Sequence, residues 1–263
     1  MVRGKRGADD DPLRPQRHPH GWLRWETGMS GSEERRNRLL QIGSAAAFLV
    51  VAVVLVLIVI SANKTSGGDT NLEDVGLVGN QLKGIPQNGL VLGEPSAKVT
   101  LYEFGDLKCP VCKAFSEEIV PNVIDSKVRD GEAKIEFKNF TIIDEESTPA
   151  GAAAIAAGAQ GRGWSFIELF YRNQGPETSS YVTDAFLTEI AKGAGVPDIT
   201  QWNKDRKSPK TVAEVESTTQ EAEKLGFTGT PSFAVEGPGS NGLETLGTPG
   251  SSEAIEEAID AAG

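Results

Sequence analysis

The sequence has few of the residue types that most often bind metal ions. Its 263 residues include two cysteines, Cys109 and Cys112, and two histidines, His18 and His20, both far upstream. A structural zinc site needs four ligands, so this Cys-x-x-Cys spacing argues against a zinc ribbon, and we expect no metal. A disulfide across two residues closes a very small loop and adds little stability. A redox-active pair is therefore favoured, with a structural disulfide as the alternative.

The chain also lacks an excess of basic residues, with a formal net charge of −11. Residues 1–38 carry nine Lys/Arg and six Asp/Glu, which leaves 17 and 31 for the remainder. Proteins that bind nucleic acid usually present a basic face, so we expect no nucleic-acid partner for the acidic remainder.

Charged residues are absent between Leu39 and Asn63, and Ile42–Ile60 is almost wholly apolar. A helix of that length spans a hydrocarbon core of roughly 30 Å. A cleaved signal peptide, the alternative, has an apolar core of about 7–15 residues and a small-residue cleavage site. The apolar stretch here is longer, and Ile60-Ser61-Ala62 is a weak cleavage site. We therefore predict a transmembrane signal-anchor helix over 39–62.

The flanking charges predict the orientation of that helix. Arg35, Arg36 and Arg38 precede it, whereas Lys64 alone follows closely. The positive-inside rule then places the N-terminus in the cytoplasm and both cysteines outside, where disulfides form. The predicted organisation is a disordered cytoplasmic tail (1–38), the anchor (39–62), a linker (63–81) and a folded domain (82–263) in the cell membrane.

The cysteines are predicted to lie at a junction between a strand and a helix. Val99–Phe104 has the pattern of a short buried strand, Gly105-Asp106 interrupts it, and helical periodicity begins at Pro110. The first turn of a helix does not use the N–H that proline lacks. Cys109 therefore precedes a helix, where unpaired N–H groups and the helix dipole favour a thiolate.

Periodicity and turn residues predict the remaining elements, including a helical insertion over about 145–207 and an ordinary core role for the aromatic residues of 164–171. The predicted elements are strands at 90–92 and 134–140, helices at 110–129 (kinked at Pro121), 149–160, 164–172, 182–192 and 208–225, a hairpin of strands before 236 and at 243–246, and a final helix from Ser251 or Ser252.

These features together resemble the DsbA-like branch of the thioredoxin superfamily over roughly residues 82–262. The resemblance is carried by the strand and Cys-Pro-x-Cys turn at 99–112, by the Ala-rich helix followed by Gln-Gly-Arg-Gly-Trp-Ser-Phe at 160–166, and by Gly-Thr-Pro-Ser-Phe at 229–233. It implies an α/β thioredoxin fold with an inserted helical subdomain, here preceded by one transmembrane helix.

The resemblance also implies roles for matched residues. Cys109 would be the exposed nucleophile and Cys112 the buried resolving thiol. Pro231 matches the cis-proline of the family, which would present the backbone of Thr230 to an extended substrate. A plain turn at Thr230-Pro231 is the alternative. Pro110 and Val111, between the cysteines, are expected to contact substrate as well.

Three further residues near the cysteine pair, Glu103, Lys108 and Val111, could influence its chemistry. Glu103 matches a buried acid that could relay the proton of Cys112, although a solvated glutamate at a strand end is equally compatible with the sequence. Lys108 is expected to be a surface lysine. Val111 stands where strongly oxidising relatives have histidine, so it offers no side-chain donor to the thiolate.

The resulting functional prediction is a membrane-tethered, extracytoplasmic protein-disulfide oxidoreductase that needs no cofactor. Its partners would be exported proteins with cysteine thiols and a quinone-linked thiol oxidase of the membrane that reoxidises it. The alternatives are a reductase or isomerase of the same fold and a non-catalytic binding module for exported clients.

Overall fold

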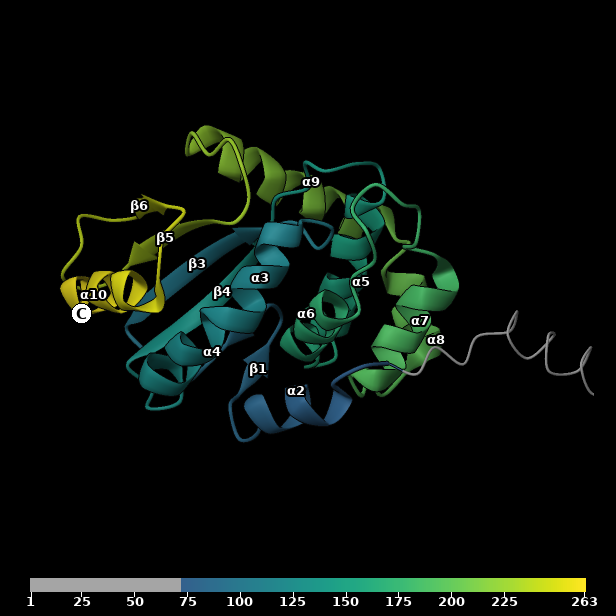
Figure 1. Cartoon of the computed structure of the whole chain (residues 1–263), viewed down its shortest axis with the longest axis horizontal. Helices are drawn as coiled ribbons and strands as arrows, with labels where there is room; N and C mark the ends of the chain where they lie inside the picture. Colours follow the sequence, from purple (N-terminus) through teal and green to yellow (C-terminus); the bar gives the residue numbers. More distant parts are fainter. Residues whose placement is uncertain (1–71) are drawn as a thin grey trace, which may run out of the picture. The chain divides into compact units, whose positions relative to one another are not determined.

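Two parallel strands form the centre of the sheet in this computed structural model, which describes residues 72–263 (Figure 1). β3 (Val99–Gly105) is buried on nearly its whole length, whereas β4 (Ala133–Asn139) alternates between buried and half-buried residues. Such alternation is the pattern of a strand with one face covered. The sheet of the described part has the order β1-β2-β4-β3-β5-β6, and every neighbouring pair except β3 and β4 is antiparallel.

Helices surround this sheet and account for most of the other described elements. The remaining strands are β1 (Gln87–Asn88), β2 (Val91–Leu92), β5 (Ser232–Glu236) and β6 (Glu244–Gly247). The helices are α2 (Val75–Gln81), α3 (Pro110–Glu118), α4 (Val120–Val123), the π-helix η1 (Ile124–Val128), α5 (Ser147–Gly158), α6 (Gly163–Arg172), α7 (Asp184–Gly193), α8 (Ile199–Asp205), α9 (Pro209–Lys224) and α10 (Ser252–Ala262).

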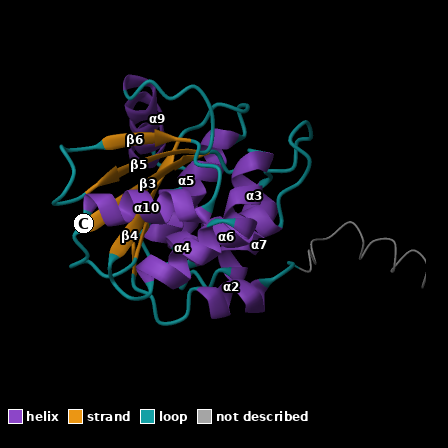
Figure 2. Cartoon of the chain, turned by 60° about the vertical axis from the view of Figure 1, so that its left-hand side comes forward, coloured by secondary structure: helices purple, strands orange, loops and turns teal. Residues whose placement is uncertain are grey.

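The two faces of the sheet are covered by different helices. Residues of α3, α4 and α10 belong to the larger apolar core, and α9 closes a smaller core around Phe104 and Phe227 (Figure 2). Helices α5 to α8 follow one another between β4 and α9 and gather beside the sheet (Figure 1). This arrangement confirms the predicted thioredoxin-like α/β fold with a helical insertion.

Some element boundaries differ from those predicted. The helix predicted over 110–129 is interrupted at Ile119, before Pro121, because proline cannot donate the hydrogen bond that would continue the helix. The strand predicted over 90–92 is β2 (Val91–Leu92), and β1, which was not predicted, pairs on its outer side. α8 was not predicted. Its buried apolar contribution is the single residue Trp202.

The folded part begins earlier than predicted. Helix α2 lies within the stretch 63–81 that was interpreted as a linker, because Val78 and the following Leu82 are buried in the core. The predicted tail (1–38) and membrane anchor (39–62) lie outside the described residues. Within 72–263, no helix is both long and apolar enough to cross a membrane.

Candidate active site

Both cysteines lie where β3 gives way to α3. Cys109 is the residue before the helix, with an extended backbone, and Pro110 occupies the first helical position. The backbone N–H of Cys112 donates to the Sγ of Cys109 at 3.4 Å. The Cys109 sulfur therefore caps the helix, where the positive end of the helix dipole favours a thiolate.

The two thiols are both free but differ in acidity. Cys112 has no exposed surface, and burial raises the pKa of its thiol well above the ordinary value. A hydrogen bond from Cys112, helped by backbone groups of Cys112 and Val111, lowers the pKa of Cys109 to about 6 against the effect of burial. Cys109 itself is 4% exposed. The prediction of an exposed nucleophile is therefore wrong, whereas the lowered pKa was expected.

Asp106 holds the turn that carries the cysteines. Its fully buried carboxylate accepts the backbone N–H of Lys108 at 2.9 Å through Oδ1. Its Oδ2 accepts the N–H groups of Ile142 and Ile143 at 2.8 and 3.0 Å. The turn is thus tied to the loop that leads from β4 into the helical insertion. From the sequence, Asp106 was predicted only to interrupt the strand, because Ile142 and Ile143, which also donate to it, are distant along the chain.

The helical insertion supplies two further contacts to the same turn. Gln174, just after α6, donates its side-chain amide to the carbonyls of Leu107 and Cys109 at 2.7 and 3.1 Å. The hydroxyl of Tyr171 donates to the carbonyl of Asp106 at 3.3 Å. Tyr171 is buried in the core, as predicted for its aromatic cluster, and it also helps to position the redox turn.

Lys108 is not the surface lysine that was predicted, since it is 1% exposed. Its ammonium pairs with Asp144 and, at 3.0 Å, with Glu146, and it lies 5.3 Å from the ring centre of Tyr181. Burial opposes the charge, yet hydrogen bonds to the two carboxylates hold the pKa of Lys108 above its ordinary value. The charge of Lys108 is therefore neutralised by Asp144 and Glu146 at the start of the helical insertion.

We expect Lys108→Met to destabilise the protein by about 1–3 kcal/mol. Removing one partner of a fully buried ion pair costs about 3–5 kcal/mol, and Asp144 and Glu146 are partly exposed, which reduces the cost. Urea unfolding measures the change. The matched control is Lys113→Met, whose pair with Glu117 lies at the surface and should matter by less than about 1 kcal/mol. If the pKa of Cys109 rose in Lys108→Met, the ammonium would act on the thiolate, which would contradict the interpretation that it only pairs with Asp144 and Glu146.

Glu103 lies in β3 with only 2% of its surface exposed, so the buried interpretation is confirmed over the solvated one. Burial, together with repulsion from Glu168, raises the pKa of Glu103 to about 8. The charge of Glu103 in turn contributes to the raised pKa of Cys112. A protonated carboxyl with this pKa can exchange a proton with a buried thiol near neutral pH.

Thr230 and Pro231 are far from the cysteines in the sequence but lie beside Cys109 in the folded protein. The peptide bond between them is cis, as the resemblance implied. The thiol of Cys109 donates to the carbonyl oxygen of Thr230 at 3.5 Å. Pro231 is buried and Thr230 is half-buried.

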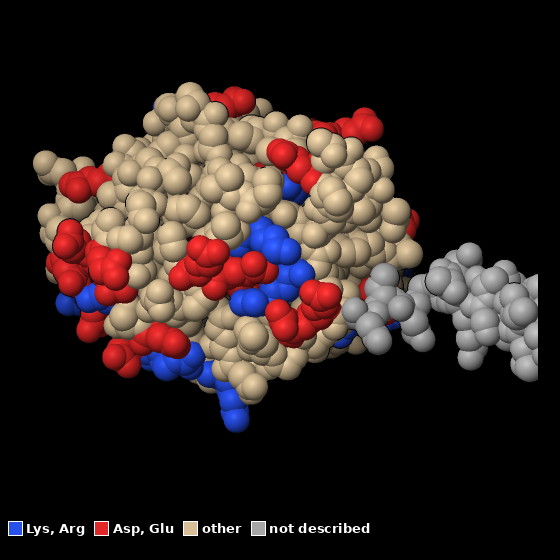
Figure 3. All heavy atoms as spheres, in the orientation of Figure 1, with Lys and Arg blue, Asp and Glu red and all other residues tan. Residues whose placement is uncertain are grey.

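Exposed apolar side chains lie close to the turn that carries Cys109. Val111 is 49% exposed and Ile142 is 43% exposed, and Pro110 is exposed between the cysteines. Charged side chains are sparse over the region between β6 and the start of α3 (Figure 3). The surface next to the thiol therefore suits an uncharged stretch of polypeptide.

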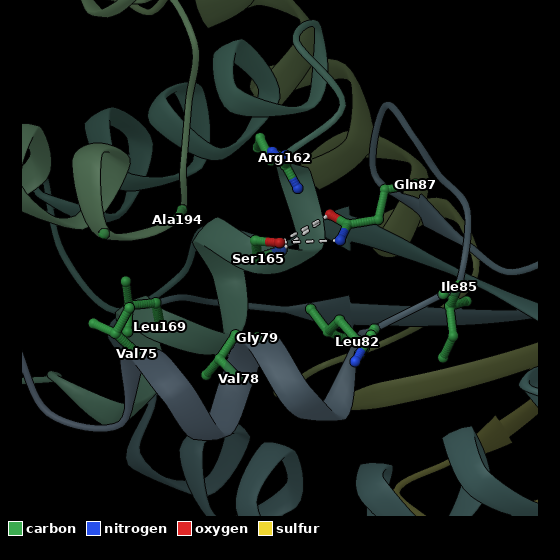
Figure 4. Close-up of a pocket in the computed structure, with 13 residues that line it drawn as sticks. Val75, Val78, Gly79, Leu82, Ile85, Gln87, Arg162, Ser165, Leu169 and Ala194 are labelled. Atoms are coloured by element: carbon green, nitrogen blue, oxygen red, sulfur yellow. Dashed lines mark hydrogen bonds between the residues drawn. The ribbon is translucent and has the colours of Figure 1, made fainter.

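A cavity of about 250 Å³ lies elsewhere, between α2, β1 and α6 (Figure 4). Gln87 and Ser165 meet at its wall through hydrogen bonds, and Arg162 also lines it. None of the predicted site residues lines this cavity. Among residues 72–263, no group of three or more His, Cys, Asp or Glu side chains is arranged to hold a metal ion.

Comparison with known proteins connects this site to disulfide chemistry. A protein-family model described as thioredoxin matches residues 86–261. The probable disulfide bond formation protein D of Bacillus cereus is 32% identical over 150 residues, which cover 56% of this chain and 69% of the relative. The disulfide bond formation protein D of Bacillus subtilis is 30% identical over 158 residues, which cover 59% of this chain and 68% of the relative.

A solved structure shows the same similarity in three dimensions. The crystal structure of oxidised BdbD from Bacillus subtilis superposes with a TM-score of 0.58 at 25% sequence identity. The superposition covers 67% of this chain and 95% of that chain.

Proposed function

Since the chain belongs to the thioredoxin family and is a thiol–disulfide oxidoreductase of the DsbA/BdbD type, we propose a specific role for it. In this proposal it introduces or exchanges disulfides in exported proteins while tethered to a membrane. The observation that carries the proposal is the unequal acidity of Cys109 and Cys112 across one helical turn. A thiol with a pKa of about 6 is largely ionised at neutral pH, whereas its neighbour stays protonated.

The proposed reaction begins from the Cys109–Cys112 disulfide. A substrate thiolate attacks the sulfur of Cys109, a new disulfide joins Cys109 to substrate, and Cys112 leaves as a thiolate. A second substrate thiolate then attacks the substrate sulfur of that bond and releases Cys109 as a thiolate. The substrate has lost two electrons and formed a disulfide, and the enzyme pair has gained them as two reduced sulfurs.

Glu103 supplies the proton that this exchange requires. Cys112 is buried, so its leaving thiolate must take a proton from a group inside the protein. The carboxyl of Glu103 is protonated near neutral pH and lies close enough to influence the Cys112 thiol electrostatically. In the reverse direction the Glu103 carboxylate accepts the proton before Cys112 attacks.

The backbone at Thr230 provides the proposed contact for the substrate main chain. Its carbonyl oxygen lies 3.5 Å from the Cys109 sulfur, so an extended chain bonded to the Thr230 backbone would bring its own sulfur next to Cys109. Pro110 and Val111 would contact substrate side chains from the exposed first turn of α3.

Membrane tethering and location outside the cytoplasm are supported by the sequence. The uncharged stretch between Leu39 and Asn63 follows a basic leader, and disulfide formation belongs to oxidising compartments. A quinone-linked thiol oxidase in the same membrane would accept the electrons from the reduced pair and restore the disulfide.

Reporter cysteines test this topology. In a Cys109→Ser/Cys112→Ser background, which has no other cysteine, Thr178→Cys places a single thiol on an exposed loop of the domain. A membrane-impermeant maleimide applied to intact cells should label this variant. The matched variant Ser30→Cys, in the predicted cytoplasmic tail, should be labelled only after lysis. The reverse pattern would overturn the orientation, and labelling of a chain that starts near Asn63 would show a cleaved signal peptide.

A further inference from the structure

A second buried acid lies behind the redox pair and has no role in the mechanism described so far. Glu168 is 1% exposed and is the one acidic residue of α6, a helix rich in aromatic and apolar side chains. The hydroxyl of Ser116 donates to its Oε2 at 3.1 Å. Arg172, one turn later on α6, forms its ion pair with Asp74 instead. A carboxyl buried without a directly paired cation is costly, so its position needs a physical reason.

The surroundings of Glu168 connect it to Cys112 by two routes. Ser116 follows Cys112 by four residues on α3, so both side chains occupy the same face of that helix. Glu103, on β3, is buried close enough that the charge of Glu168 raises its pKa. Glu103 in turn acts on Cys112. Glu168 of α6 and Ser116 of α3 thus form a buried hydrogen-bonded pair, and Glu103 of β3, also buried, lies within electrostatic reach of Glu168.

We propose that Glu168 is a positioning residue of the exchange reaction, forming with Glu103 a buried carboxyl pair that decides when Glu103 can exchange a proton with Cys112. The inference rests on the roles proposed above for Cys109, Cys112 and Glu103. When Glu168 is ionised, its charge opposes ionisation of Glu103, which keeps a proton ready for the departing Cys112 thiolate. When Glu168 is neutral, Glu103 ionises at lower pH and can accept the Cys112 proton.

The groups that face Glu168 place its titration in the physiological range. Burial raises the pKa of Glu168 to about 7, although the Ser116 hydroxyl and the charge of Arg172 favour the carboxylate. Glu117, on the exposed side of α3, opposes ionisation of Glu168. With Glu103 near 8, the two carboxyls titrate as a coupled pair around neutral pH.

The test is the pH dependence of the step that Cys112 carries out. When reduced full-length protein meets excess oxidised glutathione, Cys109 attacks first, and Cys112 then resolves the mixed disulfide and releases glutathione. Stopped-flow measurement from pH 5 to 9 separates the two phases. We expect Glu168→Gln, which keeps the hydrogen bond from Ser116, to move the profile of the second phase to lower pH by about one unit, as the removal of a nearby like charge does. The first phase should keep its profile.

Three further variants make the result specific. Ser116→Ala should shift the second phase in the same direction but less, because loss of the hydroxyl leaves Glu168 more often neutral. Glu118→Gln removes an exposed acid from α3 and should shift nothing. In a Glu103→Gln background, Glu168→Gln should have no further effect.

An unshifted second phase in both Glu168→Gln and Ser116→Ala would overturn the inference, and so would a full shift that persists without Glu103. Failure of the proposed function would look different, since the wild-type protein would then show no first phase at all.

Discussion

Cys112→Ser is expected to accumulate covalent complexes with client proteins, whereas Cys109→Ser is expected to form almost none. The Cys109 thiolate survives in the first variant and can still attack a disulfide, but the thiol that resolves the complex is gone. In the second variant the remaining Cys112 has no exposed surface and a raised pKa, so it is protonated and inaccessible. Both variants should lose catalysed disulfide formation down to the rate of glutathione alone.

Non-reducing electrophoresis of cells that express each variant measures the complexes, and oxidation of a reduced, unfolded substrate measures activity. The double variant Cys109→Ser/Cys112→Ser provides the background for both assays. Complexes that disappear on reduction and are confined to Cys112→Ser support the assigned roles. If wild-type protein fails to oxidise the substrate and no variant forms reducible complexes, a non-catalytic binding module becomes the better description.

Val111→His is expected to make the protein a stronger oxidant. A disulfide is oxidising to the extent that its reduced form is stabilised, and the thiolate of Cys109 is the main contributor to that stabilisation. The donors to Cys109 come from Cys112 and from the backbone, including that of Val111, whose side chain is exposed and supplies none. An imidazole at this position adds a donor without being buried.

The expected size of the change follows from the link between acidity and potential. One pKa unit and 30 mV each correspond to about 1.4 kcal/mol for a two-electron couple. Lowering the pKa of Cys109 from about 6 by one or two units would therefore raise the potential by roughly 30–60 mV, up to about a hundredfold in the equilibrium constant. The wild-type value should lie between the roughly −270 mV of thioredoxin and −120 mV of DsbA.

Thiolate absorbance against pH and a glutathione redox titration measure both quantities. Val111→Phe is the matched control, because it adds an aromatic ring without a donor and should leave the potential unchanged. A wild-type potential already near that of DsbA, and unmoved in Val111→His, would show that another group sets the potential. A potential near that of thioredoxin would instead favour the reductase or isomerase direction.

The elements predicted best from sequence are those whose signal is local. β4 alternates apolar and polar residues, and its burial alternates in the same way. Ser208 and Ser251 cap α9 and α10 through side-chain hydrogen bonds, as their positions before helical periodicity indicated. α2 and α8 were not predicted, because each is seven residues long and buries one residue of its own. So short a helix depends on the core it joins more than on its own pattern.

The active site shows the same division between local and distant signals. The helix start at Cys109 could be predicted from neighbouring residues alone. Lys108 could not be placed, because the acids that compensate its charge lie on a loop more than thirty residues later. Glu168 did carry one signal, as the lone acid in an aromatic helix, but only the packing of α6 against α3 shows that it faces Ser116.

Both edges of the sheet are short, which matters if the proposed substrates are incompletely folded chains. β1 has two residues and follows Pro86, and β6 has four, beginning with the exposed Glu244. Long, flat edge strands offer rows of unpaired N–H and C=O groups to which an unfolded chain can add as a further strand, the first step of aggregation. These edges offer few such groups. The sheet itself is therefore a poor template for co-aggregation. In the proposed reaction a client would be released once its bond to Cys109 is exchanged.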